Sequence, residues 1–274
     1  MPVTGAAIGR KPALLALAVP VLAGLAYQAA FGAPLRYLLM NAAALAGGLA
    51  LIAFAGSVIA PVLRHRRAAI LVLLALFALP LLTGPAIAGV ARWLPLPGGF
   101  ALHSGMLALP LLAALAAEDE QDAPLALLAA LLIALLQPDG ASAAAVTLAA
   151  VGLAKVWRGW QMPLVAAVGL LVTVIATLHG ELAPQPFVER VLADAMLAHP
   201  LVGLALLAAQ LAGFLLIVFG LDHPRPMRLA IGGSLFGFAI MSLMNVYPAP
   251  LLGFGAAPII GYALALAIPR RTSQ

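Results

Sequence analysis

Glu189 is the side chain best suited to acid–base chemistry, because it lies in a polar segment between two long apolar runs. The segment extends from Gly180 to about His199 and contains Arg190 and Asp194, whose spacing of four allows them to pair on a helix. The apolar spacing from Phe187 to Ala198 predicts an amphipathic helix, on which Glu189 has no cation three or four residues away. An unpaired carboxylate at a membrane–water boundary can have a raised pKa and act as a general base; the alternative is a simply solvated carboxylate.

A second candidate is a short segment rich in proline and glycine that follows another apolar run. It reads Arg92-Trp93-Leu94-Pro95-Leu96-Pro97-Gly98-Gly99-Phe100 and leads into His103 and Ser104. The planar guanidinium of Arg92 suits a phosphate group, which makes this residue a candidate phosphate ligand. The alternative is an interfacial anchor, in which Trp93 belongs to the aromatic belt and Arg92 reaches toward lipid headgroups. We expect His103, just inside the next apolar run, to be a hydrogen-bonded packing residue rather than a metal ligand.

Two further interruptions of apolar sequence contain turn-forming residues. Gln137, Pro138, Asp139 and Gly140 predict a tight hairpin tip, in which Asp139 caps the following helix. The stretch from Asn245 to Pro258 contains three prolines and two glycines. Irregular backbone at membrane depth is tolerated only where it is buried in protein or lines a cavity. This stretch therefore predicts a cavity wall, and the alternative is a kinked start of a helix.

The elements that carry these groups must be membrane helices. Of the 274 residues, 65% are hydrophobic and 8% are charged, which is more apolar sequence than a water-soluble core can hold. We predict an all-α, polytopic helical bundle forming a single integral membrane domain over residues 1–274. About ten spans are expected, at roughly 12–31, 36–57, 68–91, 99–117, 124–137, 140–156, 163–179, 200–220, 229–246 and 250–268. The fifth and sixth spans are short, so a re-entrant pair stays an alternative to two full crossings.

The distribution of basic residues predicts that both termini lie inside. With that orientation eleven lysines and arginines fall on inside segments and three on outside segments, which is a clear positive-inside bias. The inside set is Arg10, Lys11, Arg64, Arg66, Arg67, Lys155, Arg158, Arg225, Arg228, Arg270 and Arg271; the outside set is Arg36, Arg92 and Arg190. The one long outer loop then lies between the seventh and eighth spans and carries Glu189.

Composition and motifs exclude several kinds of chemistry. The chain has no cysteine, which excludes disulfides, thiol nucleophiles and cysteine-ligated metals. Its net charge of +5 is explained by basic residues that flank membrane helices, so no nucleic-acid partner is expected. No zinc-protease, Walker or serine-hydrolase motif is present. No metal site and no cofactor are assigned from the sequence, and a divalent cation is left open.

These landmarks together resemble the SEDS family (shape, elongation, division and sporulation), whose RodA- and FtsW-like members are ten-span membrane glycosyltransferases. The matching segments, in order, are Arg92-Trp93-Leu94 with Gly98-Gly99-Phe100 and Ser104, then Gln137-Pro138-Asp139, then Pro248-Ala249-Pro250-Leu251 with Gly253-Phe254-Gly255. The long outer loop is where the family keeps its essential aspartate. Counting back from Leu201-Val202-Gly203, that position falls on Glu189.

The chain departs from the family pattern at several positions. His103 replaces a proline, and Gly105 and Ala108 stand where the family has a glutamate and a lysine. Ala256 and Ala257 stand at the serine-rich end of the last tip. The charged pair and the serines are therefore missing, although a carboxylate is kept at Glu189.

The resemblance implies an inverting glycosyltransferase that polymerises peptidoglycan from lipid II at the outer face of a bacterial inner membrane, for cell-wall synthesis and cell shape. Glu189 would be the catalytic base. The implied substrate-binding residues are Arg92, Arg190, Ser104, Asp139, Pro248, Pro250, Gly253 and Gly255. The implied partners are a lipid-linked sugar donor, a glycan acceptor, membrane lipid and a single-span transpeptidase.

Two other functions stay open from the sequence. The losses at positions 105, 108, 256 and 257 favour a non-catalytic relative that serves as a scaffold or binds lipid-linked sugar in an envelope complex. A transporter is the third possibility. Apart from Asn41, Gln210 and a few hydroxyl residues, the predicted spans are bare of polar groups, which argues against ion conduction but not against lipid movement.

Overall fold

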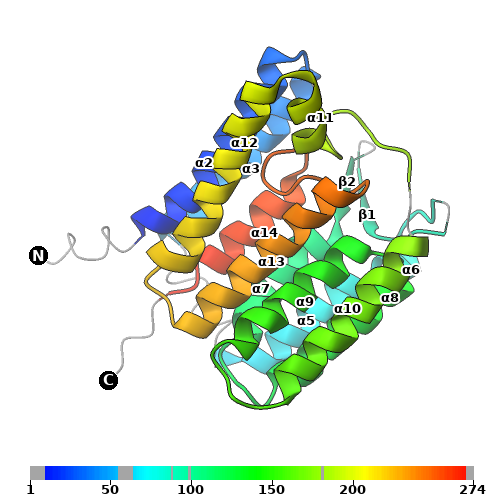
Figure 1. Ribbon diagram of the computed structural model, residues 1–274, viewed down its shortest axis with the longest axis vertical. Coiled ribbons are helices and arrows are strands. Elements are labelled where there is room, and N and C mark those ends of the chain that lie inside the picture. Colours follow the sequence, from blue (N-terminus) through cyan, green and yellow to red (C-terminus); the bar gives the residue numbers. More distant parts are fainter. Residues whose placement is uncertain (1–9, 55–63, 88, 98–99, 180–181, 270–274) are drawn as a thin grey trace, which may run out of the picture.

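The computed structural model describes residues 10–54, 64–87, 89–97, 100–179 and 182–269, and these form a helical bundle with one small β-hairpin (Figure 1). The elements up to the hairpin are α2 (Lys11–Ala30), α3 (Leu35–Phe54), α5 (Arg66–Ala78), α6 (Pro80–Thr83), β1 (Trp93–Leu96) and β2 (Phe100–His103). They are followed by α7 (Ser104–Ala116), α8 (Ala123–Leu136), α9 (Gly140–Ala154), α10 (Gln161–His179) and α11 (Val191–Ala198). The last are α12 (Pro200–Leu215), the π-helical turn η1 (Leu216–Gly220), α13 (Arg225–Met244) and α14 (Ala256–Leu266).

The apolar helices fall where the sequence predicts spans. Six helical segments of the described chain are long and apolar enough to cross a bilayer: 11–30, 35–54, 66–83, 161–179, 200–220 and 225–244. Four shorter apolar helices, α7, α8, α9 and α14, occupy the other predicted positions. The chain is thus a helical protein with several helices of membrane-spanning length, while the number of ten crossings and the inside–outside orientation stay predictions.

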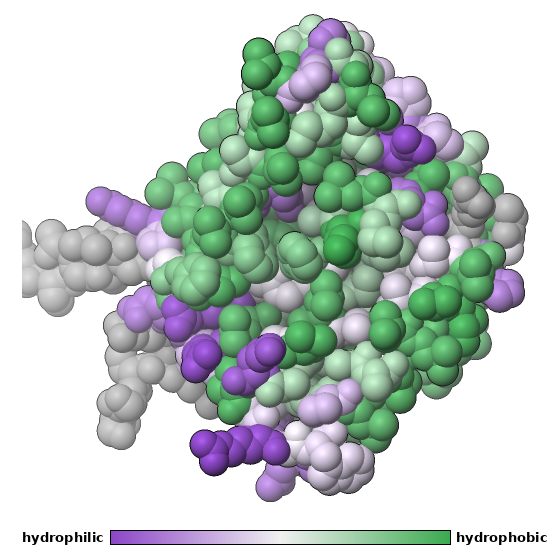
Figure 2. Space-filling model, viewed as in Figure 1, coloured by the Kyte–Doolittle hydropathy of each residue, from purple (hydrophilic) through white to green (hydrophobic). Residues whose placement is uncertain are grey.

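The outward surface of the described helices is strongly apolar, as expected for a protein that lies in lipid. Large apolar side chains project from the long helices with most of their surface exposed; Leu201 is 83% and Phe54 is 79% exposed. Figure 2 shows hydrophobic residues over the middle of the molecule and hydrophilic residues gathered toward its ends. This pattern fits a bundle whose middle lies in the hydrocarbon core.

The centre of the bundle is built from helices rich in small residues. Helix α9 packs against α10 and α13, and α14 packs against α7 (Figure 1). Between α13 and α9 the backbones approach so closely that a Cβ added at Gly237 would lie 2.5 Å from the carbonyl oxygen of Ala144. Close packing of this kind stabilises helix association in lipid, where the hydrophobic effect does not drive helices together.

The expected bounds of two spans need correction. The fourth span was expected at 99–117, but α7 begins only at Ser104, and the residues before it form a hairpin in which Trp93 pairs with His103 and Leu96 with Phe100. Pro95 and Pro97 explain the difference, because proline favours extended backbone in itself and in the residue before it. The third predicted span, 68–91, ends at Thr83.

The second correction concerns the long loop. The amphipathic helix expected over Phe187–Ala198 begins only at Val191. Phe187 (φ 65°) and Arg190 (φ 55°) both have left-handed backbone, which an α-helix cannot include. Glu189 therefore lies on an irregular segment in front of α11 and not on one side of a helix. Gly98, Gly99, Gly180 and Glu181 lie outside the described residues.

Candidate functional site

The irregular segments gather at one end of the bundle, which we call the cavity end, around a cavity of about 480 Å³. Its walls come from the start of α3, the hairpin, the loop before α11 and the tip between α13 and α14. Among the described residues the lining includes Arg36, Tyr37, Trp93, Phe100, His103, Gln185, Glu189, Pro248, Phe254 and Gly255. The cavity thus combines several aromatic rings with the guanidinium of Arg36 and with Glu189, the one carboxylate among the described residues of its lining.

Glu189 reaches the cavity because its segment is attached to the α13–α14 tip. Its backbone forms a β-bridge with Pro248, and the Ala249 N–H donates to the carbonyl oxygen of Val188 at 2.9 Å. The left-handed turn at Phe187 lets the chain fold back, so that the backbone N–H of Gln185 donates to Glu189 Oε2 at 2.8 Å. Two sequence segments sixty residues apart therefore hold this carboxylate.

The environment of Glu189 shifts its protonation. The residue is only 7% exposed, and burial raises the pKa of its carboxyl above the ordinary value. The N–H of Gln185 and the positive charge of Arg92 act in the opposite direction but do not cancel the effect of burial on the pKa. A buried carboxylate that borders a cavity and has a raised pKa has the properties of a general base.

The tip between α13 and α14 is held by polar side chains on the first two helices. Asn41 Nδ2 donates to the Gly253 carbonyl at 3.0 Å, and Asn41 Oδ1 accepts from the Gly255 N–H at 3.1 Å. Gln28 Nε2 donates to the Leu252 carbonyl at 3.3 Å. The rings of Tyr37 and Phe254 stack with centroids 3.7 Å apart. The cavity wall is therefore a fixed structure rather than the kinked helix start considered as an alternative.

Arg92 is completely buried, so it is not the headgroup-seeking anchor that the sequence allowed. Its guanidinium carbon lies 4.6 Å from the centroid of the Trp93 ring and 4.9 Å from that of Tyr247. Its carbonyl oxygen accepts hydrogen bonds from Ser104, from the backbone N–H at 3.0 Å and from Oγ at 3.3 Å. Ser104 is itself fully buried and also donates to the Phe77 carbonyl. Both residues lie behind the lining of the cavity.

Asp139 also lies behind the cavity and caps α9, as the sequence predicts. Its carboxylate accepts from the N–H of Ser142 at 3.2 Å and from the Ser142 hydroxyl. His103 Nε2 lies 3.5 Å from Asp139 Oδ2, and His103 Nδ1 accepts the Met106 N–H at the start of α7. His103 is thus the buried, hydrogen-bonded residue that the sequence predicts, although it caps α7 and touches the cavity instead of lying inside a span.

The other predicted binding residues are divided between the cavity and its surroundings. Pro248 and Gly255 line the cavity, whereas Pro250 and Gly253 do not. A Cβ at Gly253 would lie 2.7 Å from the Val188 carbonyl, so this glycine allows the tip to approach the loop. Arg190 forms the predicted pair with Asp194, at 3.4 Å on the surface, and does not line the cavity.

Sequence reasoning missed the cation that does line the cavity. Arg36 was counted only as an outside charge, and Asn41 only as an isolated polar residue in a span. The signal available was that Asn41 lies five residues after Arg36 on one helix, so that both mark the same helix end. Within the described ranges, no group of three or more His, Asp or Glu side chains could hold a metal ion.

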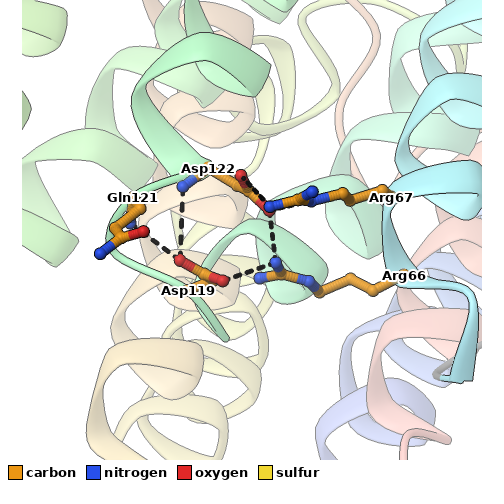
Figure 3. A network of polar contacts seen from close by, with 5 residues as sticks. All are labelled: Arg66, Arg67, Asp119, Gln121 and Asp122. Atoms are coloured by element: carbon orange, nitrogen blue, oxygen red, sulfur yellow. Dashed lines mark hydrogen bonds and ion pairs between the residues drawn. The ribbon is translucent and has the colours of Figure 1, made fainter.

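The opposite end of the bundle, which we call the charged end, has a different character. Arg66 Nη2 contacts Asp119 Oδ2 at 2.7 Å and Asp122 Oδ2 at 2.5 Å, and Arg67 Nε contacts Asp122 Oδ2 at 2.8 Å (Figure 3). These pairs tie the start of α5 to the loop between α7 and α8. Gln121 contributes a backbone N–H to Asp119 Oδ1 at 2.9 Å.

Comparisons with known proteins identify a similar fold but no family. No protein-family model and no curated protein matches this chain by sequence. By structure it is similar to a chain in a solved structure described as the structural coordination of polymerization and crosslinking by a peptidoglycan synthase complex. The TM-score is 0.61 with 21% identity, and the match covers 92% of this chain and 95% of that chain. At this identity the likeness shows a shared fold.

Proposed function

We propose that this protein is a SEDS-like inverting glycosyltransferase of a bacterial inner membrane, which polymerises a lipid-linked sugar of the lipid II type for cell-wall synthesis. The observation that carries the proposal is Glu189, a buried carboxylate with a raised pKa on the wall of the cavity described above. The fold shared with a chain of a peptidoglycan synthase complex supports it.

The proposed reaction assigns one proton transfer to the protein. Glu189 accepts the proton of the glycan acceptor's hydroxyl group as that oxygen attacks the anomeric carbon of the donor. The new glycosidic bond forms with inversion, and the bond to the lipid diphosphate breaks, so that the electron pair leaves with the diphosphate. The aromatic rings of Trp93 and Phe100 give the sugar faces to pack against.

The departing diphosphate needs a positive charge near the cavity. Arg36 lines the cavity and is exposed, so its guanidinium is available to an anion. Arg92 and Arg190, which the sequence put forward for this role, lie outside the lining. We therefore assign the diphosphate contact to Arg36, with the lipid tail in the surrounding bilayer and a single-span transpeptidase as a partner of the complex.

The test is polymer synthesis by the purified protein. Lipid II is incubated with the protein in lipid nanodiscs, with and without a candidate transpeptidase, and glycan chains are separated on gels. Glu189→Gln should reduce synthesis by about 10²–10⁴-fold, the usual contribution of a general base. Asp194→Asn, a surface carboxylate on α11, is the matched control and should retain full activity. Normal synthesis by E189Q removes Glu189 as the base.

One observation favours the second candidate, a catalytically inactive relative that binds lipid-linked sugar. The space that a charged pair would need is closed, because a Cβ at Gly105 would lie 1.9 Å from Ser142 Oγ and Ala108 is fully buried. If wild-type protein binds lipid II in nanodiscs but makes no glycan with any partner, this second function replaces the first.

A further inference from the structure

The guanidinium of Arg92 is a buried charge without a hydrogen-bond partner among the described residues. Its side chain has no exposed surface, and none of its three guanidinium nitrogens has a hydrogen-bond partner among the described residues. The rings of Trp93 and Tyr247 contact it, but such contacts offset only part of the cost of removing a charge from water. A negative charge must lie close enough to compensate.

Two buried carboxylates at the cavity end are candidates for that role. Asp139 already accepts the N–H and hydroxyl of Ser142 and has His103 beside it. Glu189 accepts the N–H of Gln185 and is also stabilised by its own backbone N–H. Among the described residues only Asp139 has a hydroxyl donor and an imidazole in contact with it, so Glu189 is the carboxylate that depends more on a distant cation.

The fold brings Arg92 to the back of the wall that carries Glu189. Tyr247, whose ring covers the guanidinium, is followed by Pro248, and the backbone of Pro248 forms the bridge with Glu189. The charge of Arg92 lowers the pKa of Glu189, against the larger effect of burial. The cation thus acts on the carboxylate from behind, while the substrate side stays open.

We propose that Arg92 is the counter-ion of Glu189, a positioning residue that favours the ionised carboxylate from behind the cavity wall and does not touch the substrate. The inference takes from the proposed function only the role of Glu189 as a base.

Other charged and titratable groups surround Glu189 but are less suited to this role. Arg36 faces it across the cavity from α3, where its exposure leaves it screened by solvent. Arg190 is 43% exposed and paired with Asp194 on α11. The remaining groups on packed elements are Tyr37 from α3, His103 from β2, Asp139 before α9 and Tyr247 from the tip.

The experiment measures the protonation of Glu189 directly. Dicyclohexylcarbodiimide reacts with protonated carboxyl groups in apolar surroundings, so its attachment to Glu189 can be followed by mass spectrometry of the full chain in nanodiscs over a pH series. In Arg92→Gln the midpoint of labelling should move to higher pH, and labelling at neutral pH should rise several-fold. Arg190→Gln, which removes a nearby surface cation, is the matched control and should follow the wild type.

Several results would overturn the inference. One is a labelling profile of R92Q that coincides with the wild type, and another is an equal shift in R190Q. If R92Q alone does not fold, the double variant R92Q/E189Q should be recovered folded, because both charges are gone. If folded protein is recovered from R92Q/D139N, or is not recovered from R92Q/E189Q, Arg92 is not the counter-ion of Glu189.

This test is independent of catalysis. Labelling needs no substrate, so a shifted profile in a protein that makes no glycan supports the counter-ion and contradicts only the proposed function. An active wild-type protein, together with an unshifted labelling profile in R92Q, supports the proposed function and contradicts only the counter-ion.

Discussion

The two ends of the bundle use charged residues in opposite ways. At the charged end, Arg66 and Arg67 share the carboxylates of Asp119 and Asp122 in a partly exposed network. At the cavity end, Arg92 and Glu189 are buried without an ion pair to any described residue within 4 Å. Paired surface charges contribute little energy and can be kept at low cost, whereas isolated buried charges weaken the fold. The charged end therefore holds its charges in contact pairs, whereas the cavity end keeps two buried charges apart.

The two ends should respond differently to acid, which is the largest effect we expect. Below the raised pKa of Glu189 the base becomes protonated, so polymer synthesis should fall by about tenfold per pH unit. Because the folded state then binds this proton more tightly than the unfolded chain does, the Glu189 contribution to stability increases as the pH falls through that range.

The charged end should behave in the reverse sense. The Gln121 N–H and Arg66 lower the pKa of Asp119 in the folded protein. The ionised Asp119 therefore stabilises the fold above the ordinary carboxyl pKa, and this stabilisation is lost as the pH falls through the lowered pKa of the folded state. Initial rates and melting temperatures over one pH series test both statements. A melting temperature that falls together with the activity would contradict them.

Removal of a carboxylate should destabilise the protein more at the cavity end than at the charged end. Asp139→Ala removes a cap and leaves buried donors of Ser142 without acceptors, which should cost about 2–4 kcal/mol of unfolding free energy. Asp122→Ala, at the charged end, should cost at most about 1 kcal/mol. Thermal unfolding in detergent compares the two, and equal losses would remove the distinction.

Variants of one arginine at each end should show that only the arginine of the cavity end contributes to substrate binding. Arg36→Gln removes the cation that lines the cavity and should raise the KM for lipid II about tenfold, with a smaller change in kcat. Arg36→Lys should recover part of the affinity. Arg67→Gln leaves the KM unchanged. A loss confined to kcat in R36Q would instead place Arg36 in the transition state alone.

The smallest effect is expected within the charged end itself. Arg66 is 14% exposed and contacts both aspartates, so Arg66→Gln should cost about 1 kcal/mol. Arg67 is 78% exposed, and Arg67→Gln should leave the melting temperature unchanged. Equal destabilisation by both variants would show that the network acts as one unit.

The helices were predictable from sequence because their signal is length and apolar composition, which lipid imposes directly. The helices α2, α8, α9 and α12 begin and end within a few residues of the predicted spans. The cap at Asp139 and the pair of Arg190 with Asp194 were also predicted correctly, because each depends on residues three or four apart.

The irregular parts were harder because long-range contacts decide them. The strands of the β-hairpin are apolar up to His103 and resemble membrane-spanning sequence, apart from Pro95. Nothing in the sequence indicates positive φ at Phe187, a bulky residue that rarely adopts it. The cavity could not be assembled either, because Arg36, Glu189 and Phe254 meet only after α3, the long loop and the tip have packed together.

The attachment of Asn41 to the tip has a consequence for how the protein can be controlled. Asn41 grips Gly253 and Gly255, and the same tip carries Pro248, to which Glu189 is bridged. A displacement of α3 would therefore reach the tip, and with it the segment of Glu189, through Asn41 and through the Tyr37 ring stacked on Phe254. Under the proposed function, a partner that moved α3 would change the position of the base without entering the cavity.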